Sequence, residues 1–205
     1  LDVIRAKSDL LEAKFYEVNK FKSLKIRLLG RHQQINANVA VKAIKALSLY
    51  GIKIKDDSIR RGLSNTLWPG RCEVIRRNPY VVIDGAQNAA SARVLKEAIR
   101  DCFPRNKDKR LILVLGISSD KDIKGICSEL YSLADKVILT KAESARASDP
   151  HVLAEYFHGK EKYITNSVSQ ARRLSMCLAA KRDLILVSGS LFVIGEFKYG
   201  KRRFN

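Results

Sequence analysis

The stretch Tyr80-Val81-Val82-Ile83-Asp84-Gly85-Ala86-Gln87-Asn88 decides the fold. An apolar, mostly β-branched run stops at an acid and a glycine, and apolar residues then recur at helical spacing from Val94 to Ile99. This pattern predicts a strand that turns at Asp84-Gly85 into a helix. Because open α/β sheets bind ligands where such strands end and helices begin, we expect a ligand site at this turn.

The alternation of strand and helix continues toward the carboxyl terminus. Near-continuous apolar runs, typical of strands covered on both faces, occupy residues 80–83, 111–115, 137–139 and 184–187. Helical patterns cover about residues 89–100, 123–133, 152–157 and 168–179, and a further helix opens at Leu191. This alternation predicts an α/β fold with a mostly parallel sheet, flanking helices and right-handed crossovers.

The first third of the chain has a different pattern. Alternating apolar residues predict a half-buried strand over Lys22–Leu29, which Gly30 ends. Apolar residues at helical spacing from Ile35 predict a helix that Gly51 closes.

A short second helix and a turn follow. Asp56 or Asp57 can cap a helix that runs through Leu63. Trp68-Pro69-Gly70 has Pro and Gly at the two central positions of a tight turn. We place the domain boundary there, which gives domains of residues 1–67 and 68–205.

Composition limits the class of protein. With 205 residues and 46% hydrophobic residues, the chain can bury a core. It contains no long apolar run and opens with no basic-then-apolar leader, so we expect neither a membrane span nor a signal peptide. It begins at Leu1, which indicates a processed product or a fragment.

The cysteines and histidines favour a metal-free chain in the cytoplasm. The four cysteines are scattered with no C-x-x-C pair, as expected of free thiols in a reducing cytosol. The three histidines form no metal-binding pattern, so we expect no metal ligands in this chain.

The net charge of +18 is spread along the chain. Residues 1–70 contain 14 basic and 6 acidic side chains (net +8), and the remainder contains 25 and 15 (net +10). The only local cluster is Lys198, Lys201, Arg202 and Arg203. The charge either attracts polyanionic substrates or decorates solvated faces, and both interpretations stay open. Without interleaved aromatic residues or a docking motif, we do not expect nucleic-acid binding.

Two polar segments precede the opening stretch. Gln33 and Asn36 lie three residues apart at the start of the first helix, so they share a face. Their carboxamides match an adenine edge, although polar residues are also common at helix starts. The turn at Trp68-Pro69-Gly70 projects Arg71, which suits a bidentate grip on phosphate or is an ordinary surface arginine.

The opening stretch itself offers a carboxylate and an amide. Asp84, at a strand's carboxyl end, can accept hydrogen bonds from ribose hydroxyls. Asn88 either orients a phosphate or caps the helix that follows. An Asp-Gly turn with a capping Asn is an equally good structural interpretation.

Polar residues also follow the other strands. The loop Ser118-Ser119-Asp120-Lys121 follows the second, Thr140 follows the third with Arg146 six residues beyond, and Ser188-Gly189-Ser190 follows the fourth and opens a helix. Gly-Ser at a helix amino end suits a carboxylate or phosphate, although each segment alone is also a plausible turn or cap. Because four strands end this way, we predict one cleft shaped for a nucleoside triphosphate and an amino acid.

The order of these motifs supports a family assignment. L-x-G-x-H-Q-x-x-N-A, W-P-G-R-x-E, D-G-A-x-N, G-x-x-x-D-K-D, T…R-A and S-G-S-L-x-x-x-G-E, from Leu28 to Glu196, together resemble the folylpolyglutamate synthase / dihydrofolate synthase family of Mur ligases. Residues 1–67 resemble the tail of that family's central ATPase domain, and residues 68–205 resemble its Rossmann-like C-terminal domain. The family's G-T-N-G-K-G-S phosphate loop, magnesium-binding residues and modified lysine have no counterpart here.

The resemblance implies an ATP-dependent ligase that adds L-glutamate to folate or dihydropteroate through an acyl phosphate, with Mg²⁺. The catalytic residues and magnesium ligands would lie in a missing N-terminal half, so we expect this piece alone to be inactive. The resemblance implies that Asn36 and Gln33 contact adenine, that Arg71 contacts the phosphates and that Asp84 contacts the ribose. Ser188 and Ser190 would lie near the incoming glutamate or its acceptor, and Asp120 and Lys121 would help to form that glutamate pocket.

One residue departs from the family pattern. Gln87 stands where the family has a histidine that contacts the nucleotide. Glutamine donates a hydrogen bond but carries no proton or charge near neutral pH. A degenerate, non-catalytic module that binds a nucleotide or a partner is therefore the alternative.

Overall fold

The structure, a computed structural model, describes residues 1–104, 106 and 108–200. The chain divides into two compact units, one of Leu1–Arg27 with Arg31–Thr66 and one of Leu28–Gly30 with Leu67–Asn205. Lys201, Arg202 and Arg203 of the basic cluster lie outside the described residues.

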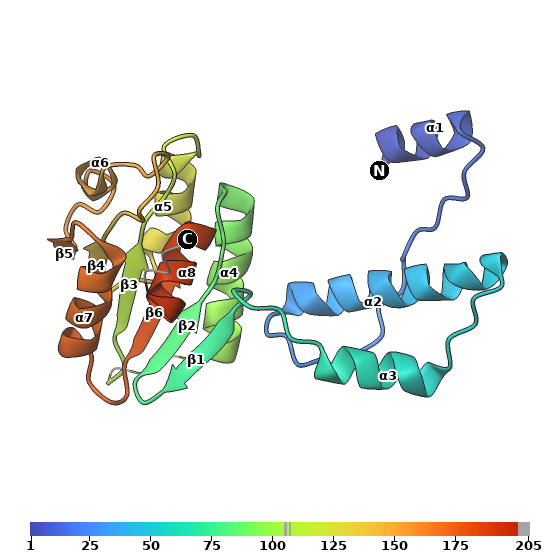
Figure 1. Cartoon of the computed structure of the whole chain (residues 1–205), viewed down its shortest axis with the longest axis horizontal. Helices are drawn as coiled ribbons and strands as arrows, with labels where there is room; N and C mark the ends of the chain where they lie inside the picture. The colour runs from blue at the N-terminus through green and yellow to red at the C-terminus, as the bar shows by residue number, and fades with distance from the viewer. Residues whose placement is uncertain (105, 107, 201–205) are drawn as a thin grey trace. The chain divides into compact units, whose positions relative to one another are not determined.

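The first unit is helical. It contains α1 (Asp2–Leu10), α2 (Arg31–Ala46), the short 3₁₀ helix η1 (Leu47–Tyr50) and α3 (Asp56–Asn65) (Figure 1). The predicted helix is confirmed and begins earlier than Ile35, and Gly51 ends η1 in the left-handed conformation with a φ of 79°. The residue at the amino-terminal cap of α3 is Lys55, so neither Asp56 nor Asp57 is the cap: both lie in the first turn, where acids also stabilise a helix.

The strand predicted over Lys22–Leu29 is wrong. Two side-chain amides on α2 take the backbone groups that a neighbouring strand would otherwise bind. Asn38 accepts from the N–H of Lys22 and donates to its carbonyl, both at 2.9 Å. Gln34 does the same for Leu24, again at 2.9 Å. The segment is therefore not part of a sheet.

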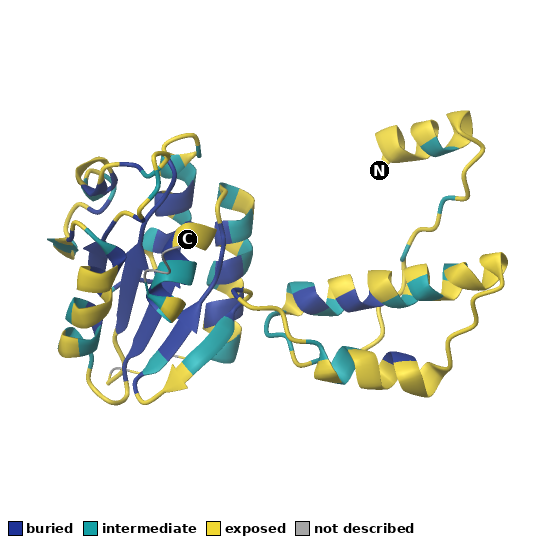
Figure 2. Ribbon diagram, viewed as in Figure 1, coloured by how far each residue is buried: buried dark blue, intermediate teal, exposed yellow. Residues whose placement is uncertain are grey.

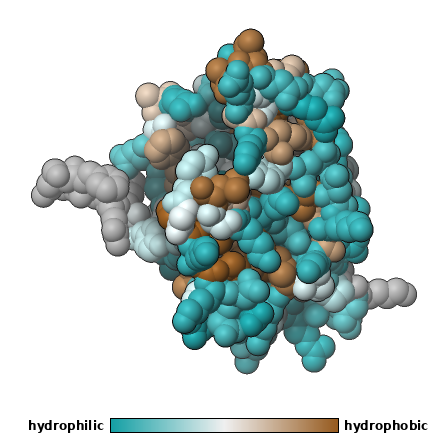
Figure 3. Space-filling view, turned by 90° about the vertical axis from the view of Figure 1, so that its right-hand side faces the viewer, coloured by the Kyte–Doolittle hydropathy of each residue, from teal (hydrophilic) through white to brown (hydrophobic). Residues whose placement is uncertain are grey.

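The helical unit leaves many apolar side chains exposed. Figure 2 shows its helices mostly in the colour of exposed residues, and large side chains such as Val3, Val39 and Tyr50 are more than one-third accessible. Figure 3 shows hydrophobic residues exposed among hydrophilic ones on one face of the molecule.

No helix within residues 1–104, 106 and 108–200 is long and apolar enough to cross a membrane.

The second unit is built on a six-stranded sheet. Its strands are β1 (Glu73–Arg77), β2 (Tyr80–Ile83), β3 (Leu111–Leu115), β4 (Lys136–Leu139), β5 (Glu161–Ile164) and β6 (Leu184–Ser188). Their order is β1-β2-β6-β3-β4-β5, in which β1 pairs antiparallel with β2 and every other pairing is parallel. The predicted α/β fold with a mostly parallel sheet is confirmed.

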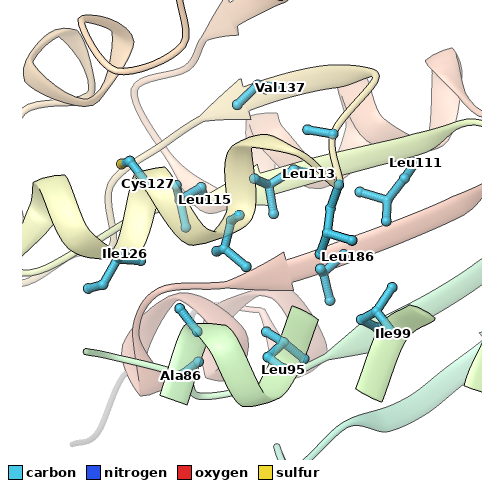
Figure 4. Close-up of a cluster of buried hydrophobic side chains, with 14 of the residues drawn as sticks. Ala86, Leu95, Ile99, Leu111, Leu113, Leu115, Ile126, Cys127, Val137 and Leu186 are labelled. Atoms are coloured by element: carbon cyan, nitrogen blue, oxygen red, sulfur yellow. The ribbon is translucent and has the colours of Figure 1, made fainter. Parts of the chain in front are cut away.

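Helices cover both faces of this sheet. They are α4 (Ala89–Cys102), α5 (Ile123–Tyr131), α6 (Pro150–Ala154), α7 (Val168–Leu178) and α8 (Leu191–Tyr199). Leu111, Leu113 and Leu115 of β3 pack on the α4 and α5 side, as Figure 4 shows. Ile112 and Val114, which point to the opposite face, join the cluster that includes residues of α7 and α8.

The two edge strands were not predicted. β1 ends in Arg76-Arg77 and β5 begins with Glu161-Lys162, so neither has the continuous apolar run of a strand buried on both faces. The four interior strands, which have that run, match the predicted ranges to within one residue at each end.

All five helices that follow the carboxyl ends of parallel strands begin with a side-chain cap. The oxygen of each capping residue accepts a hydrogen bond from a backbone N–H of the first turn, and the capping residues are Asn88, Asp122, Asp149, Ser167 and Ser190. The positive ends of the helix dipoles therefore gather at the carboxyl edge of the sheet.

Candidate functional site

The residues that follow adjacent strands continue the backbone ladder at the carboxyl edge. The N–H of Asp84 donates to the carbonyl of Val187 at 3.0 Å, and the N–H of Gly116 donates to that of Ser188 at 3.3 Å. The N–H of Thr140 donates to the carbonyl of Leu115 at 2.9 Å. The ends of β2, β6, β3 and β4 are thus placed side by side.

The Asp84 carboxylate joins two turns. It is buried, and its Oδ1 accepts from the N–H of Ala86 at 2.8 Å while its Oδ2 accepts from the N–H of Cys72 at 2.7 Å. The N–H of Gly85 donates to the carbonyl of Gly70 at 2.9 Å. These three bonds form a clasp between the Trp68–Glu73 turn and the end of β2.

The Trp68–Glu73 turn has the predicted geometry. The N–H of Arg71 donates to the carbonyl of Trp68 at 3.3 Å, and Gly70 has a φ of 74°, which suits the third position of a type II turn. Glu73 reinforces the turn by accepting from the N–H of Gly70 at 2.9 Å and by pairing with Lys198 of α8 at 2.6 Å.

Helix α8 packs against both clasped turns. A Cβ atom on Gly70 would lie 2.6 Å from Cδ1 of Ile194, and one on Gly85 would lie 2.5 Å from Cδ2 of Leu191. A side chain at either position would have to displace the tip of Ile194 or Leu191, so glycine leaves this packing undisturbed. The packing brings Ser190, at the start of α8, next to the clasp.

Arg71 presents an available cation at this edge. Its side chain is exposed, and among the described residues it has no hydrogen-bond acceptor or carboxylate partner. The side chain of Gln87 is likewise exposed and without a partner in the described part of the chain. Both side chains are therefore accessible to a ligand.

Asn88 caps α4. Its Oδ1 accepts from the N–H of Ser91 at 2.8 Å, and Ser91 Oγ accepts from the N–H of Asn88 at 3.1 Å. The capping interpretation is confirmed, and the Nδ2 amide of Asn88 remains the group that a ligand can bind.

Cys72 is not a nucleophile in this arrangement. Burial, and then the nearby Asp84 carboxylate, raise the pKa of its thiol to about 12. The thiol is therefore neutral at physiological pH, and its backbone N–H is the group that the site uses.

The loops after β3 and β4 are joined to each other. Arg146 Nη2 lies 2.6 Å from Asp120 Oδ2, and Lys121 Nζ lies 3.2 Å from the same oxygen. The hydrogen bond from Arg146 lowers the pKa of Asp120. The N–H of Ser119 donates to the carbonyl of Arg146 at 2.8 Å. The result is an exposed cluster of two cations around one carboxylate.

Two buried hydroxyls at the carboxyl edge lack hydrogen-bond partners. Ser188 and Thr140 are fully buried, and neither side-chain oxygen has a partner among the described residues. Ser190 differs, since its Oγ accepts from the N–H of Phe192 at 3.2 Å and caps α8. An unpaired buried hydroxyl is costly, so these two atoms retain an unused capacity to form hydrogen bonds.

Comparison with known proteins identifies the family. The family model described as "Mur ligase, glutamate ligase domain" matches residues 70–191. This chain belongs to that Mur ligase family. The resemblance derived from the order of the motifs is thus confirmed.

The relatives of this Mur ligase chain are named as folylpolyglutamate, dihydrofolate and dihydropteroate synthases. It is 36% identical over 174 residues to a probable bifunctional folylpolyglutamate synthase/dihydropteroate synthase of Halobacterium salinarum, covering 83% of this chain and 20% of that protein. It is 30% identical over 157 residues to the dihydrofolate synthase/folylpolyglutamate synthase of Escherichia coli, covering 77% and 36%. The chain therefore spans well under half the length of these relatives.

A solved structure agrees with the fold. The folylpolyglutamate synthase of Mycobacterium tuberculosis, complexed with ADP, superposes with a TM-score of 0.77 at 27% identity, covering 89% of this chain and 43% of that one. The superposition supports the α/β architecture of this Mur ligase chain.

Two predicted site residues of the Mur ligase chain lie in the helical unit. Asn36 Nδ2 donates to Gln33 Oε1 at 3.1 Å, and Gln33 Nε2 lies 3.0 Å from a ring nitrogen of His32. They share a face of α2, as predicted, with Gln33 buried and Asn36 exposed. The other eight predicted residues belong to the sheet unit.

The sequence places Thr140 and Arg146 after a strand at this edge but predicts no ligand contact for either. Their positions after a strand are visible in the sequence, whereas the unpaired hydroxyl of Thr140 and the ion pair of Arg146 with Asp120 depend on tertiary structure.

Among residues 1–104, 106 and 108–200, no group of three or more His, Cys, Asp or Glu side chains is placed to hold a metal ion.

Proposed function

We propose that this chain is the C-terminal part of an ATP-dependent ligase that adds L-glutamate to folate or dihydropteroate. The observation that carries the proposal is the clasp that sets the unpartnered Arg71 beside Asp84, next to the end of β6. The names of the relatives, and the ADP complex of the M. tuberculosis synthase, supply the reaction and the nucleotide.

Arg71 would bind the phosphates of ATP, because its guanidinium is exposed and no carboxylate among the described residues neutralises it. Asp84 would hold the turn that carries Arg71 and would accept a hydrogen bond from a ribose hydroxyl. Gln87 and the Nδ2 amide of Asn88 would donate to phosphate oxygens. The residues thus suit a nucleoside triphosphate.

Glutamate would bind toward β6, β3 and β4. Its carboxylates suit the cations Lys121 and Arg146, at the edge of the sheet where the buried hydroxyls of Ser188 and Thr140 also lie. Ser190 would contribute through the amino-terminal end of α8.

The reaction proceeds in two steps in this proposal. The pteroate or folate carboxylate takes the γ-phosphoryl group of ATP and releases ADP. The glutamate nitrogen then attacks the acyl carbon, so that an amide forms, phosphate leaves and the amine loses a proton. The remainder of the ligase would supply Mg²⁺ and the catalytic residues. Within this chain, Gln33 and Asn36 would contact adenine. Four free cysteines are compatible with a cytoplasmic location.

The test compares two preparations. The 205-residue chain alone should release no phosphate in response to folate and glutamate, and the same chain joined to a central domain that carries the phosphate loop should release it. Phosphate release by the isolated chain, or nucleotide binding without ligation by the complete protein, would contradict the proposal. The second result would favour the non-catalytic module.

A further inference from the structure

A cavity lies at the edge of the sheet opposite the candidate site, where β2, β3 and β6 begin. It has a volume of about 280 Å³ and is formed by the β1–β2 turn, the end of α4 and the residues that lead into β3 and β6. None of the predicted site residues lines it. Its size is near the lower end of the range for small-molecule pockets, roughly 300–1,000 Å³.

The wall of the cavity is aromatic and aliphatic. The rings of Tyr80 and Phe103 meet edge to face with centroids 5.6 Å apart, and Leu184 lies beside them. Both rings are only partly buried, so part of their surface faces the cavity. This wall suits a flat ring, because aromatic groups pack well against other aromatic groups.

The rim of the cavity is cationic. Arg77, Lys109, Arg110, Lys181 and Arg182 line it, and no aspartate or glutamate is among the lining residues. Except for Arg110, none of these five pairs with a carboxylate in the described part of the chain. Several cations around an apolar wall of low dielectric constant create a strong local positive potential, and this potential attracts anions.

A buried carboxylate, that of Asp183, holds the side chain of Arg110 in place. Its Nη2 lies 2.7 Å from Oδ2 of the buried Asp183, which also accepts from the backbone N–H groups of Arg110 and Ala180. This carboxylate is therefore occupied by protein donors, and the other four cations have no ion-pair partner among the described residues.

We propose that this cavity binds a small aromatic ligand that carries two or more anionic groups. The ring lies against Tyr80 and Phe103, and the anionic groups bind the cations of the rim. The site is separate from the carboxyl edge, and the proposal is independent of the ligase function.

The test uses benzene-1,3,5-tricarboxylate as the probe and the full chain at about 0.15 M salt, where weak surface attraction is screened. We expect saturable NMR shifts of the amides of Tyr80, Phe103 and Leu184. Propane-1,2,3-tricarboxylate, which has the charge without the ring, and benzyl alcohol, which has the ring without the charge, should each bind at least about tenfold more weakly.

Variants locate the site. Lys181 and Arg182 lie in an exposed turn, so K181S/R182S should fold normally and weaken probe binding about tenfold. The matched control K53S/K55S removes two cations from the helical unit and should leave the affinity unchanged. Shifts that do not saturate, equal binding of either comparison ligand, or an equal loss in K53S/K55S would overturn the proposal.

Discussion

The carboxylate of Asp84 accepts a 2.7 Å hydrogen bond from the backbone N–H of Cys72, twelve residues earlier in the chain. The bond fixes the start of β1 against the end of β2, and it thereby determines where the side chain of Arg71 begins. A single buried carboxylate thus connects the stability of this unit to the geometry of the candidate site.

Asp84→Asn is the first variant to examine. Asparagine retains one acceptor oxygen and adds a donor, so one of the two backbone N–H groups loses its partner. We expect the free energy of unfolding to fall by about 1–3 kcal/mol, with faster amide exchange at Cys72 or Ala86. Urea denaturation and hydrogen exchange measure both. Unchanged stability would mean that the clasp does not hold the turn.

Arg71→Ala should separate binding from folding. Because Arg71 has no partner in the described part of the chain, its removal should leave the unfolding free energy unchanged. In the complete ligase that we propose, kcat/KM for ATP should fall by an amount equivalent to about 1.5–3 kcal/mol, the range for a hydrogen bond to a charged group. Arg61→Ala, on the exposed surface of α3, is the control. Equal kinetics for both variants would make Arg71 a surface residue.

Gly189→Ala tests the close approach of β6 to β3. Gly189 has a φ of 99°, and an added Cβ would lie 2.6 Å from the carbonyl oxygen of Gly116, which is backbone and cannot turn aside. We expect destabilisation by about 1–3 kcal/mol in thermal or urea unfolding. In Gly195→Ala, the new Cβ meets nothing within 4 Å, and helix propensity should stabilise α8 by roughly 0.5–1 kcal/mol. Similar effects of both changes would contradict the steric argument.

Asp183→Asn tests the anchor beneath Arg110. Burial raises the pKa of Asp183, but hydrogen bonds from Arg110 and from the N–H of Ala180 outweigh it and hold the pKa below 3.8. The contribution of the carboxylate to stability is therefore present above about pH 4 and is lost as the pH falls through the lowered folded-state pKa. At pH 7 the variant should be about 1–3 kcal/mol less stable, since Arg110 is partly exposed. Its deficit should shrink in urea titrations at progressively lower pH, and a deficit that grows would contradict this account.

The sequence predicts those strands in which every residue of a continuous run is buried. The interior strands were identified because runs such as Leu111–Leu115 are apolar on both faces. The edge strands β1 and β5 were missed because charged residues interrupt them. Lys22–Leu29 has the alternation of a strand, yet Gln34 and Asn38 occupy backbone groups of this segment. Side-chain competition of that kind leaves no trace in apolar periodicity.

The sequence predicts where the candidate site lies in the fold, but it does not predict most of the contacts within the site. Parallel strands bring their carboxyl ends to one edge, so the positions of Asp84, Asp120 and Ser188 followed from the strand pattern. The strand pattern does not predict that the Asp84 carboxylate binds two turns, or that Arg146 pairs with Asp120, because each contact joins residues far apart in the chain.

The five capped helices have a consequence for the energetics of binding. Since each first turn is already held by its own side chain, a ligand arriving at this edge has little backbone to order. The entropic penalty of association should therefore fall mainly on the ligand and on exposed side chains such as Arg71.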